Sequence, residues 1–146
     1  MTKRINFDMD GTIANLYGVN GWLDYLIAED TTPYAVAEPL LNMSLLARLL
    51  NKLVRNGWEI NIISWTSRNG SAEYNASVES VKREWLAKHL KSVQFANIFV
   101  VPYGTPKQSL ADGILFDDEL RNRENWVGTA YDVDNIIGTL KELLAE

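Results

Sequence analysis

The 146-residue sequence contains no cysteine and a single histidine, His89. The first absence excludes disulfides, thiolate metal sites and thiol nucleophiles, and it is typical of a reducing compartment, so we expect a cytoplasmic protein. A metal site in this chain must therefore use oxygen ligands or His89. Because His89 lies beside Lys88 and Lys91 in a helical pattern, we interpret it as an ordinary surface residue and assign it no role.

Long apolar runs and clusters of positive charge are also missing. The longest apolar runs are far shorter than the roughly 20 residues of a membrane span, and the N-terminus lacks the apolar stretch of a secretory leader. The net charge is -5, without a basic cluster, so we expect neither a membrane nor a stably bound nucleic acid as a partner. The length and the 47% hydrophobic content predict a single domain over 1–146, and they leave the oligomeric state open.

Short runs rich in Ile, Val and Phe alternate with helical patterns along the chain. The runs predict five strands, at 4–7, 59–64, 97–101, 113–116 and 128–133, and helical spacing is clear at 44–57, 77–90 and 133–146. The runs do not alternate between polar and apolar residues, as expected of strands that are covered on both faces. The sequence therefore predicts an α/β fold, with a mostly parallel five-stranded sheet and helices on both faces. In the first helix we expect Ser44 as the N-cap and Gly57 as the stop.

About thirty residues separate the first strand from the first of these helices. This insertion is too long for a simple connection and too short for a domain. Four aromatic residues lie in it, Tyr17, Trp22, Tyr25 and Tyr34. We predict a small cap at about 14–42 that acts as a lid over the end of the sheet. The alternative is that its aromatic side chains only fill the core.

Pairs of acidic residues end two of the predicted strands. Asp8 and Asp10 follow the first strand, and Asp117 and Asp118 follow the fourth. The carboxyl ends of parallel strands meet at one edge of the sheet, where ligands bind. Four carboxylates in one crevice repel one another and become protonated unless a cation is present. A hard divalent ion with oxygen ligands fits best, so we predict a Mg²⁺ site formed by these four residues.

The other strand ends carry groups that bind phosphate. Ser64 and Thr66 lie at the end of the second strand, and Lys107 follows the third strand in a loop with Pro and Gly. Hydroxyl, backbone N–H and ammonium groups are donors for phosphate oxygens. Each feature alone would be an ordinary turn or surface residue. Because these features lie in order at successive strand ends, together they predict phosphoryl transfer.

The sequence resembles the haloacid dehalogenase superfamily of phosphohydrolases over nearly its whole length. The segment "DMDGT" at 8–12 is similar to the first motif of that family, Ser64 and Lys107 to the second and third, and "FDDE" at 116–119 to the fourth. The start "FDMDGTIANLYG" with its small insertion also resembles the 5'-nucleotidase and deoxyribonucleotidase branch. The resemblance implies a Rossmann-like sheet in the order third, second, first, fourth, fifth strand.

The resemblance also implies roles for single residues. Asp8 would be the nucleophile that becomes an aspartyl phosphate, and Asp10 would be the general acid and base, with its backbone carbonyl on Mg²⁺. Gly11 would allow a tight exit from the strand, and Thr12 would brace the loop. Lys107, together with Ser64, would hold the phosphoryl oxygens.

Two assignments stay open at this stage. The second motif places its hydroxyl seven positions after Gly57, which gives Ser64, with Thr66 as the alternative. In the fourth motif either carboxylate could contact the metal directly, and we favour Asp118, with Asp117 behind it or as a second ligand.

The substrate is the least determined property. Trp65 occupies a position where the family commonly has a small or polar residue, and we expect it to line the substrate pocket or to pack under the cap. We predict a Mg²⁺-dependent phosphomonoesterase for a small soluble phosphate, with a nucleoside monophosphate favoured. The alternatives are a phosphatase for sugar or other metabolite phosphates, and a non-catalytic phosphate-binding or regulatory module of the same fold.

Overall fold

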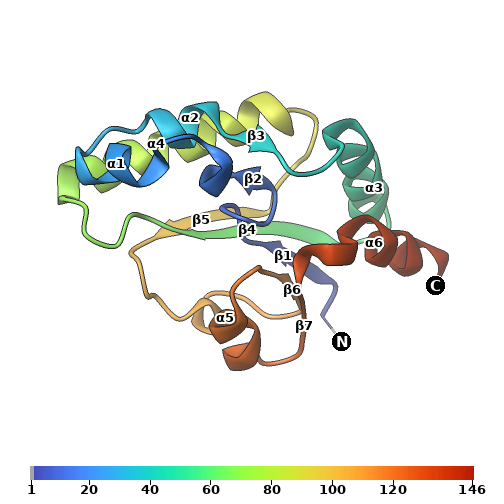
Figure 1. Ribbon diagram of the computed structural model, residues 1–146. Helices are drawn as coiled ribbons and strands as arrows, with labels where there is room; N and C mark the ends of the chain where they lie inside the picture. The colour runs from blue at the N-terminus through green and yellow to red at the C-terminus, as the bar shows by residue number, and fades with distance from the viewer. Residues whose placement is uncertain (1) are drawn as a thin grey trace.

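A five-stranded parallel sheet forms the centre of the computed structural model, which describes residues 2–146 (Figure 1). The order of its strands is β5-β4-β1-β6-β7, and every neighbouring pair is parallel. The strands are β1 (Arg4–Phe7), β4 (Glu59–Trp65), β5 (Asn97–Val101), β6 (Ile114–Phe116) and β7 (Thr129–Tyr131). The five predicted strands and their predicted order are therefore confirmed.

The two faces of the sheet are covered differently. One face packs on α3 (Met43–Arg55), α4 (Ala72–His89) and α6 (Ile136–Ala145), and α3 and α6 lie side by side in Figure 1. The other face packs on Leu110, Ala111 and Trp126, close to the short elements η2 (Lys107–Ser109) and α5 (Leu120–Asn125). Burial on both faces explains why β4 shows no alternation, with five consecutive buried residues, three of them isoleucines.

The ends of α3 differ from the prediction at one terminus. Asn42, rather than Ser44, is the N-cap, because its Oδ1 accepts a hydrogen bond of 3.1 Å from Leu45 N. The prediction of Ser44 as the N-cap is therefore wrong, since this residue lies inside the first turn of the helix. Gly57 does end the helical path, with a positive φ of 91° directly after the C-cap Asn56.

The segment predicted to form a cap, residues 14–42 and called the cap below, lies beside α4 (Figure 1). It contains β2 (Ala14–Asn15), η1 (Leu16–Gly18), α1 (Trp22–Ile27), α2 (Thr32–Val36) and β3 (Glu38–Pro39), and β2 pairs with β3. Leu16 and Tyr34 are buried in a cluster with Tyr74 and Val78 of α4. Some of the aromatic side chains of the cap therefore fill its own core, as the alternative interpretation expects.

A carboxylate connects the turn between α1 and α2 to the start of α4. Glu29 accepts hydrogen bonds from Ser71 N at 2.8 Å and from Ser71 Oγ at 2.7 Å. Ser71 is the N-cap of α4, so the negative charge lies where the helix dipole favours it. The hydroxyl of Tyr74 donates to the carbonyl of Asp30 at 3.0 Å in the same place. These bonds fix one edge of the cap on the body of the protein.

Candidate active site

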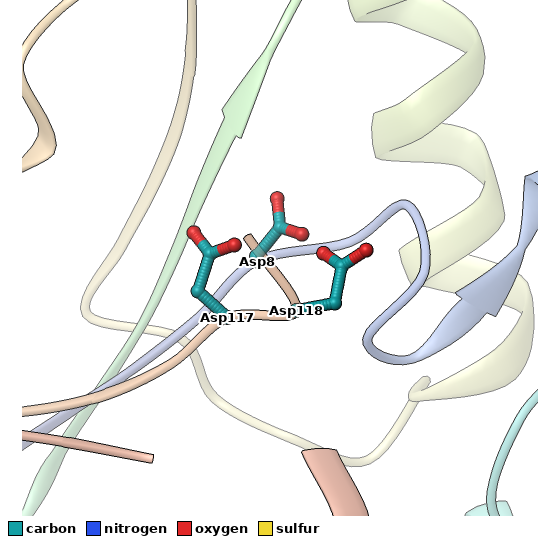
Figure 2. Close-up of side chains that lie close together, drawn as sticks. All are labelled: Asp8, Asp117 and Asp118. Carbon is teal, nitrogen blue, oxygen red and sulfur yellow. The ribbon is translucent and has the colours of Figure 1, made fainter. Parts of the chain in front are cut away.

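Three carboxylates meet at the ends of two neighbouring strands (Figure 2). Asp8 directly follows β1, and Asp117 and Asp118 directly follow β6. Each offers an oxygen atom, and these three atoms lie within 4.8 Å of one another. Figure 2 shows the three carboxyl groups on the same side of the chain, around a common space. The parallel pairing of β1 with β6 produces this geometry, since it aligns the two strand ends.

Their crowding changes the protonation of these groups. Burial, and then the charge of Asp8, raise the pKa of Asp117 to about 6 and the pKa of Asp118 to about 8. Carboxylates held so close together need a compensating positive charge to stay ionised. All the donor atoms are oxygens, the ligands that Mg²⁺ prefers. The residues present therefore fit a hard divalent cation.

Asp117 and Asp118 differ in how many hydrogen bonds their carboxylate oxygens accept. Asp117 Oδ1 accepts from Glu119 N at 2.9 Å, and Asp117 Oδ2 accepts from Lys107 Nζ at 2.7 Å and Asn122 Nδ2 at 3.1 Å. Asp118 is less buried, and its Oδ1 lies at a longer 3.4 Å from Thr12 Oγ1. Asp118 thus keeps more of its lone pairs free for a metal. This geometry supports the preference for Asp118 as the direct ligand.

Lys107 lies at the centre of the charged cluster, with 2% of its surface exposed. Its Nζ is 3.0 Å from Asp8 Oδ1 and 2.7 Å from Asp117 Oδ2. Burial alone would lower the pKa of Lys107, but Asp8 and Asp117 outweigh this effect and raise it. The side chain is therefore held as an ammonium beside Asp8, where a phosphoryl oxygen would need a donor.

The loop after β1 keeps Asp8 in place. Gly11 has a positive φ of 80°, and a Cβ at this position would collide with the carboxylate of Asp118 and approach the ring of Tyr17. Thr12 is buried, and its Oγ1 donates to Asp8 Oδ2 at 3.1 Å. Both residues thus contact the carboxylate cluster from the same tight turn.

Asp10 does not join the three clustered carboxylates. Its Oδ2 instead accepts a bond of 2.8 Å from Lys82 Nζ, on α4. The expectation that four carboxylates meet therefore holds for three of them only, because a buried ammonium holds the fourth. Burial raises the pKa of the Asp10 carboxyl above its ordinary value, and the charge of Lys82 opposes this shift.

Sequence reasoning missed Lys82, which is 1% exposed and also bonds to β4. A lysine in an amphipathic helix is usually a surface residue. A signal was nevertheless present, because Lys82 lies four residues after Val78 and four before Leu86, both apolar residues of the buried face of α4.

The structure distinguishes the two candidate hydroxyls of β4. Ser64 is fully buried inside the strand, and its Oγ is 2.7 Å from Lys82 Nζ. Thr66 is the first residue after the strand and lines the cavity above the cluster, whereas Ser64 does not. The strand extends one residue further than predicted, which moves its end from Ser64 to Trp65. Thr66, the alternative, is therefore the hydroxyl that a ligand in the cavity can reach.

A cavity of about 810 Å³ opens above these residues. Asp8, Asp10, Lys107 and Asp118 lie at its base. The cap contributes a largely apolar wall, made of Leu16, Tyr17, Trp22, Leu23, Leu26, Ile27 and Tyr34, together with Glu29. Tyr25, the remaining aromatic residue of the cap, is not part of this wall. The size suits a small molecule, and the lining joins a charged base to an apolar upper part.

Trp65 lines the opposite wall and also supports the loop that carries Lys107. Its Nε1 donates to the carbonyl of Thr105 at 2.9 Å, and its ring centre is 5.3 Å from Lys107 Nζ. The ring also packs on Tyr103, with 4.9 Å between the ring centres, and lies 5.3 Å from the guanidinium of Arg121. Of the two placements expected of Trp65, the structure shows the one in the pocket wall, and its packing partners are this loop and α5 rather than the cap.

Comparisons with known proteins agree on the fold. No family model matches the chain, and no curated protein matches it. A similar solved structure is that of D,D-heptose 1,7-bisphosphate phosphatase from B. bronchiseptica, complexed with magnesium and phosphate. The two share 13% identity and a TM-score of 0.59, over 99% of this chain and 99% of that chain. This likeness confirms the α/β, Rossmann-like fold expected of the haloacid dehalogenase superfamily. Among residues 2–146, no helix combines the length and the apolar character needed to span a bilayer.

Proposed function

We propose that this chain is a Mg²⁺-dependent phosphomonoesterase of the haloacid dehalogenase superfamily that acts on a small soluble phosphate ester. One observation carries the proposal: Asp8 lies at the base of the cavity, bonded to Lys107 and within reach of Asp118. A nucleophile, a phosphate-binding cation and oxygen ligands for a metal thus occupy one small space. The fold shared with a phosphatase agrees with this proposal.

The proposed reaction has two halves. In the first, a carboxylate oxygen of Asp8 forms a bond to phosphorus, the ester P–O bond breaks, and Asp10 gives its proton to the leaving oxygen. In the second, Asp10 takes a proton from water as the water oxygen bonds to phosphorus. The aspartyl phosphate bond then breaks, and Asp8 and free phosphate are released.

The other residues of the site would bind and neutralise the phosphoryl group. Lys107 and Thr66 are the donors that can face its oxygens. Mg²⁺, held by Asp8 and Asp118 with Asp117 behind them, would neutralise charge on the phosphoryl group and help to orient it. Gly11 and Thr12 would keep Asp8 oriented for attack.

We favour a nucleoside monophosphate as the substrate. The upper part of the cavity offers aromatic side chains from both walls, Tyr17 and Trp22 on the cap and Trp65 and Tyr103 opposite. Flat aromatic walls suit a nucleobase, since base stacking contributes roughly 1–3 kcal/mol per base. A sugar phosphate is the second candidate, because the similar structure is a phosphatase named for a sugar bisphosphate.

A non-catalytic phosphate-binding module is the remaining alternative. Three carboxylates and a buried lysine packed together are costly for a domain that only binds, because each buried charge loses hydration. Phosphoryl transfer gives these charges a use, and a simple anion-binding site needs fewer negative groups.

A phosphatase screen with a matched metal control tests the proposal. Phosphate release would be measured from nucleoside monophosphates, hexose phosphates and p-nitrophenyl phosphate, in Mg²⁺ and in chelator. We expect turnover only with Mg²⁺, restored when the chelator is saturated, and poor turnover with Ca²⁺, whose looser coordination misplaces the reacting groups. Full activity in chelator would contradict the metal requirement. Higher kcat/KM for hexose phosphates would contradict the nucleotide preference.

A further inference from the structure

Lys82 makes three hydrogen bonds from one buried atom. Its Nζ donates to Asp10 Oδ2 at 2.8 Å, to Ser64 Oγ at 2.7 Å and to the carbonyl of Trp65 at 2.8 Å. An ammonium has three N–H donors, so all of them are used. The side chain therefore has a single defined position between the loop after β1 and the end of β4.

The stability of the fold does not by itself explain why a charged side chain occupies this buried position. Its carboxylate partner is Asp10, and the other two acceptors are neutral. The ring of Tyr34 in the cap makes a cation–π contact with Nζ, which lies 5.1 Å from the ring centre. Apolar residues of similar volume often replace such buried ion pairs without loss of stability. A role of the charge in the reaction would account for its presence at this position.

The position of Lys82 determines which oxygen of Asp10 is free. Oδ2 is bound to the ammonium, so Oδ1 is the oxygen left to exchange a proton with a ligand. Asp10 lines the cavity, whereas Lys82 does not. Through Trp65, Lys82 also holds Asp10 at a fixed place relative to the strand end that carries Thr66.

We propose that Lys82 is a positioning residue, which orients the carboxyl group of Asp10 for proton transfer. This inference rests on the proposed function, because it assumes that Asp10 is the general acid and base. It assigns to Lys82 a task different from that of Lys107. Lys107 contacts Asp8 and faces the phosphoryl group, whereas Lys82 acts only through Asp10.

Two substrates separate this role from a structural one. A nitrophenolate is a weak base and leaves without a proton, whereas the alkoxide of glycerol phosphate needs one from Asp10. Replacing Lys82 by Met keeps the length of the side chain and removes its charge. In Lys82→Met we expect a nearly unchanged first half-reaction with p-nitrophenyl phosphate and a slow second half. Rapid mixing should then show a burst of about one nitrophenolate per enzyme, followed by slow turnover.

Glycerol phosphate should show no burst in Lys82→Met, since both halves of its reaction need Asp10. Its kcat should fall by about 10- to 100-fold, part of the 10²–10⁴-fold that general acid–base catalysis supplies. KM should change little, because Lys82 does not reach the substrate. Equal losses with both substrates and no burst would overturn the inference.

Three further variants complete the test. Val78→Ala removes apolar volume from the same face of α4, so it should lower the melting temperature without producing a burst. Lys88→Met changes an exposed lysine of the same helix and should behave as the parent protein. Adding Lys82→Met to Asp10→Asn should cause no further loss of activity, whereas a multiplied loss would contradict an effect through Asp10.

Ser64→Ala covers the case in which Lys82→Met does not fold, since it removes one acceptor of Lys82 and keeps the ion pair. It should reproduce the burst with p-nitrophenyl phosphate, followed by a smaller loss of turnover, and should show no burst with glycerol phosphate. A loss of turnover without a burst, or no loss at all, would overturn the inference. If the parent protein itself shows no phosphatase activity, the proposed function and this inference are both overturned. An active parent without the predicted difference overturns only the role of Lys82.

Discussion

The base of the cavity holds its charged side chains in buried hydrogen bonds, whereas the cap above it presents mostly apolar side chains, several of which are exposed. Lys107 and Asp8 at the base are 2% and 8% exposed, and Leu23 and Ile27 of the cap are 53% and 73% exposed. The base is thus preorganised for one chemical step. The cap lines the cavity mainly with apolar side chains, which contact a leaving group through its shape rather than through directed hydrogen bonds. We infer that the base determines the reaction and the cap influences which ester is bound.

The largest expected effect comes from the base. Asp8→Asn keeps the shape of the side chain and removes the nucleophile, so kcat should fall on the order of 10⁴-fold or more. Steady-state hydrolysis of p-nitrophenyl phosphate measures this loss. The melting temperature should fall less than in Asp117→Asn, because Lys107 keeps its ion pair with Asp117, although Asn has one oxygen for the two contacts that Thr12 and Lys107 make with Asp8.

Asp134→Asn is the matched control for this substitution. Asp134 is exposed and belongs to the 3₁₀ turn η3 (Val133–Asn135), so it should keep parental activity. Parental turnover in Asp8→Asn would require another nucleophile and would remove the basis of the proposed reaction.

Next in size are the effects at the two adjacent acids, which should differ in kind. Asp118→Asn should raise the Mg²⁺ concentration needed for half-maximal activity by about tenfold or more, with little loss of stability. Asp117→Asn should mainly destabilise the fold, because it breaks a buried pair with Lys107, a change that costs about 3–5 kcal/mol when one partner is removed. Mg²⁺ titrations and urea unfolding of both variants measure the two effects. If Asp117→Asn weakened Mg²⁺ binding and Asp118→Asn mainly destabilised the fold, Asp117 would be the direct ligand.

A smaller effect is expected in the upper part of the cavity. Tyr103→Ala removes an exposed ring from the wall, and kcat/KM for a nucleoside monophosphate should fall about tenfold, within the range of base stacking. Glycerol phosphate should be hydrolysed at nearly the parental rate. Trp65→Ala should also erode the preference for nucleotides, but it releases the Lys107 loop and so should lower other rates as well.

Tyr25→Ala is the control for the aromatic wall. Tyr25 belongs to the cap but does not line the cavity, so its loss should leave the substrate preference unchanged. Equal losses on both substrates in Tyr103→Ala would mean that the aromatic residues are structural.

The smallest expected effect is a pH dependence of metal binding. Without metal, the pKa of Asp118 is about 8, above the ordinary value of 3.8, so the folded state holds this proton more tightly than the unfolded chain. The stabilisation from this proton is fully present below the ordinary pKa and is lost as the pH rises through 8. Mg²⁺ competes with the same proton. The rise in melting temperature at a fixed Mg²⁺ concentration should therefore be larger at pH 8 than at pH 6.

Thermal melts of Asp118→Asn provide the control for this effect. Asn has no proton to lose, so the Mg²⁺-induced shift should become small and nearly independent of pH. A parental shift that is equal at pH 6 and pH 8 would contradict the link between Asp118 and the metal.

The sheet and the main acids could be predicted because their signals are local. Apolar runs ending in Asp8 and in Asp117 mark both the strands and their carboxyl ends, and parallel pairing then brings the acids together. Gly57 was predictable for the same reason, since a left-handed residue after a helix favours glycine.

The partners of Asp10 could not be predicted in this way, because they depend on contacts between distant segments. Lys82 reaches Asp10 across 72 positions of sequence, and only packing of α4 on the sheet makes that contact. The choice between Ser64 and Thr66 depended on one residue of strand length. The spacing from Gly57 could not determine this choice, because Trp65 pairs with Val101 of β5 and this pairing extends β4 by one residue.

The most direct measurement is the detection of the phosphorylated residue. Asp10→Asn should slow hydrolysis of the intermediate, so this variant would be mixed with p-nitrophenyl phosphate and Mg²⁺, quenched in acid and digested for mass spectrometry. We predict one phosphoryl group on Asp8, absent in chelator and absent when Asp8→Asn is added. Turnover by the parent without a phosphorylated peptide, or a phosphoryl group on another residue, would contradict the account.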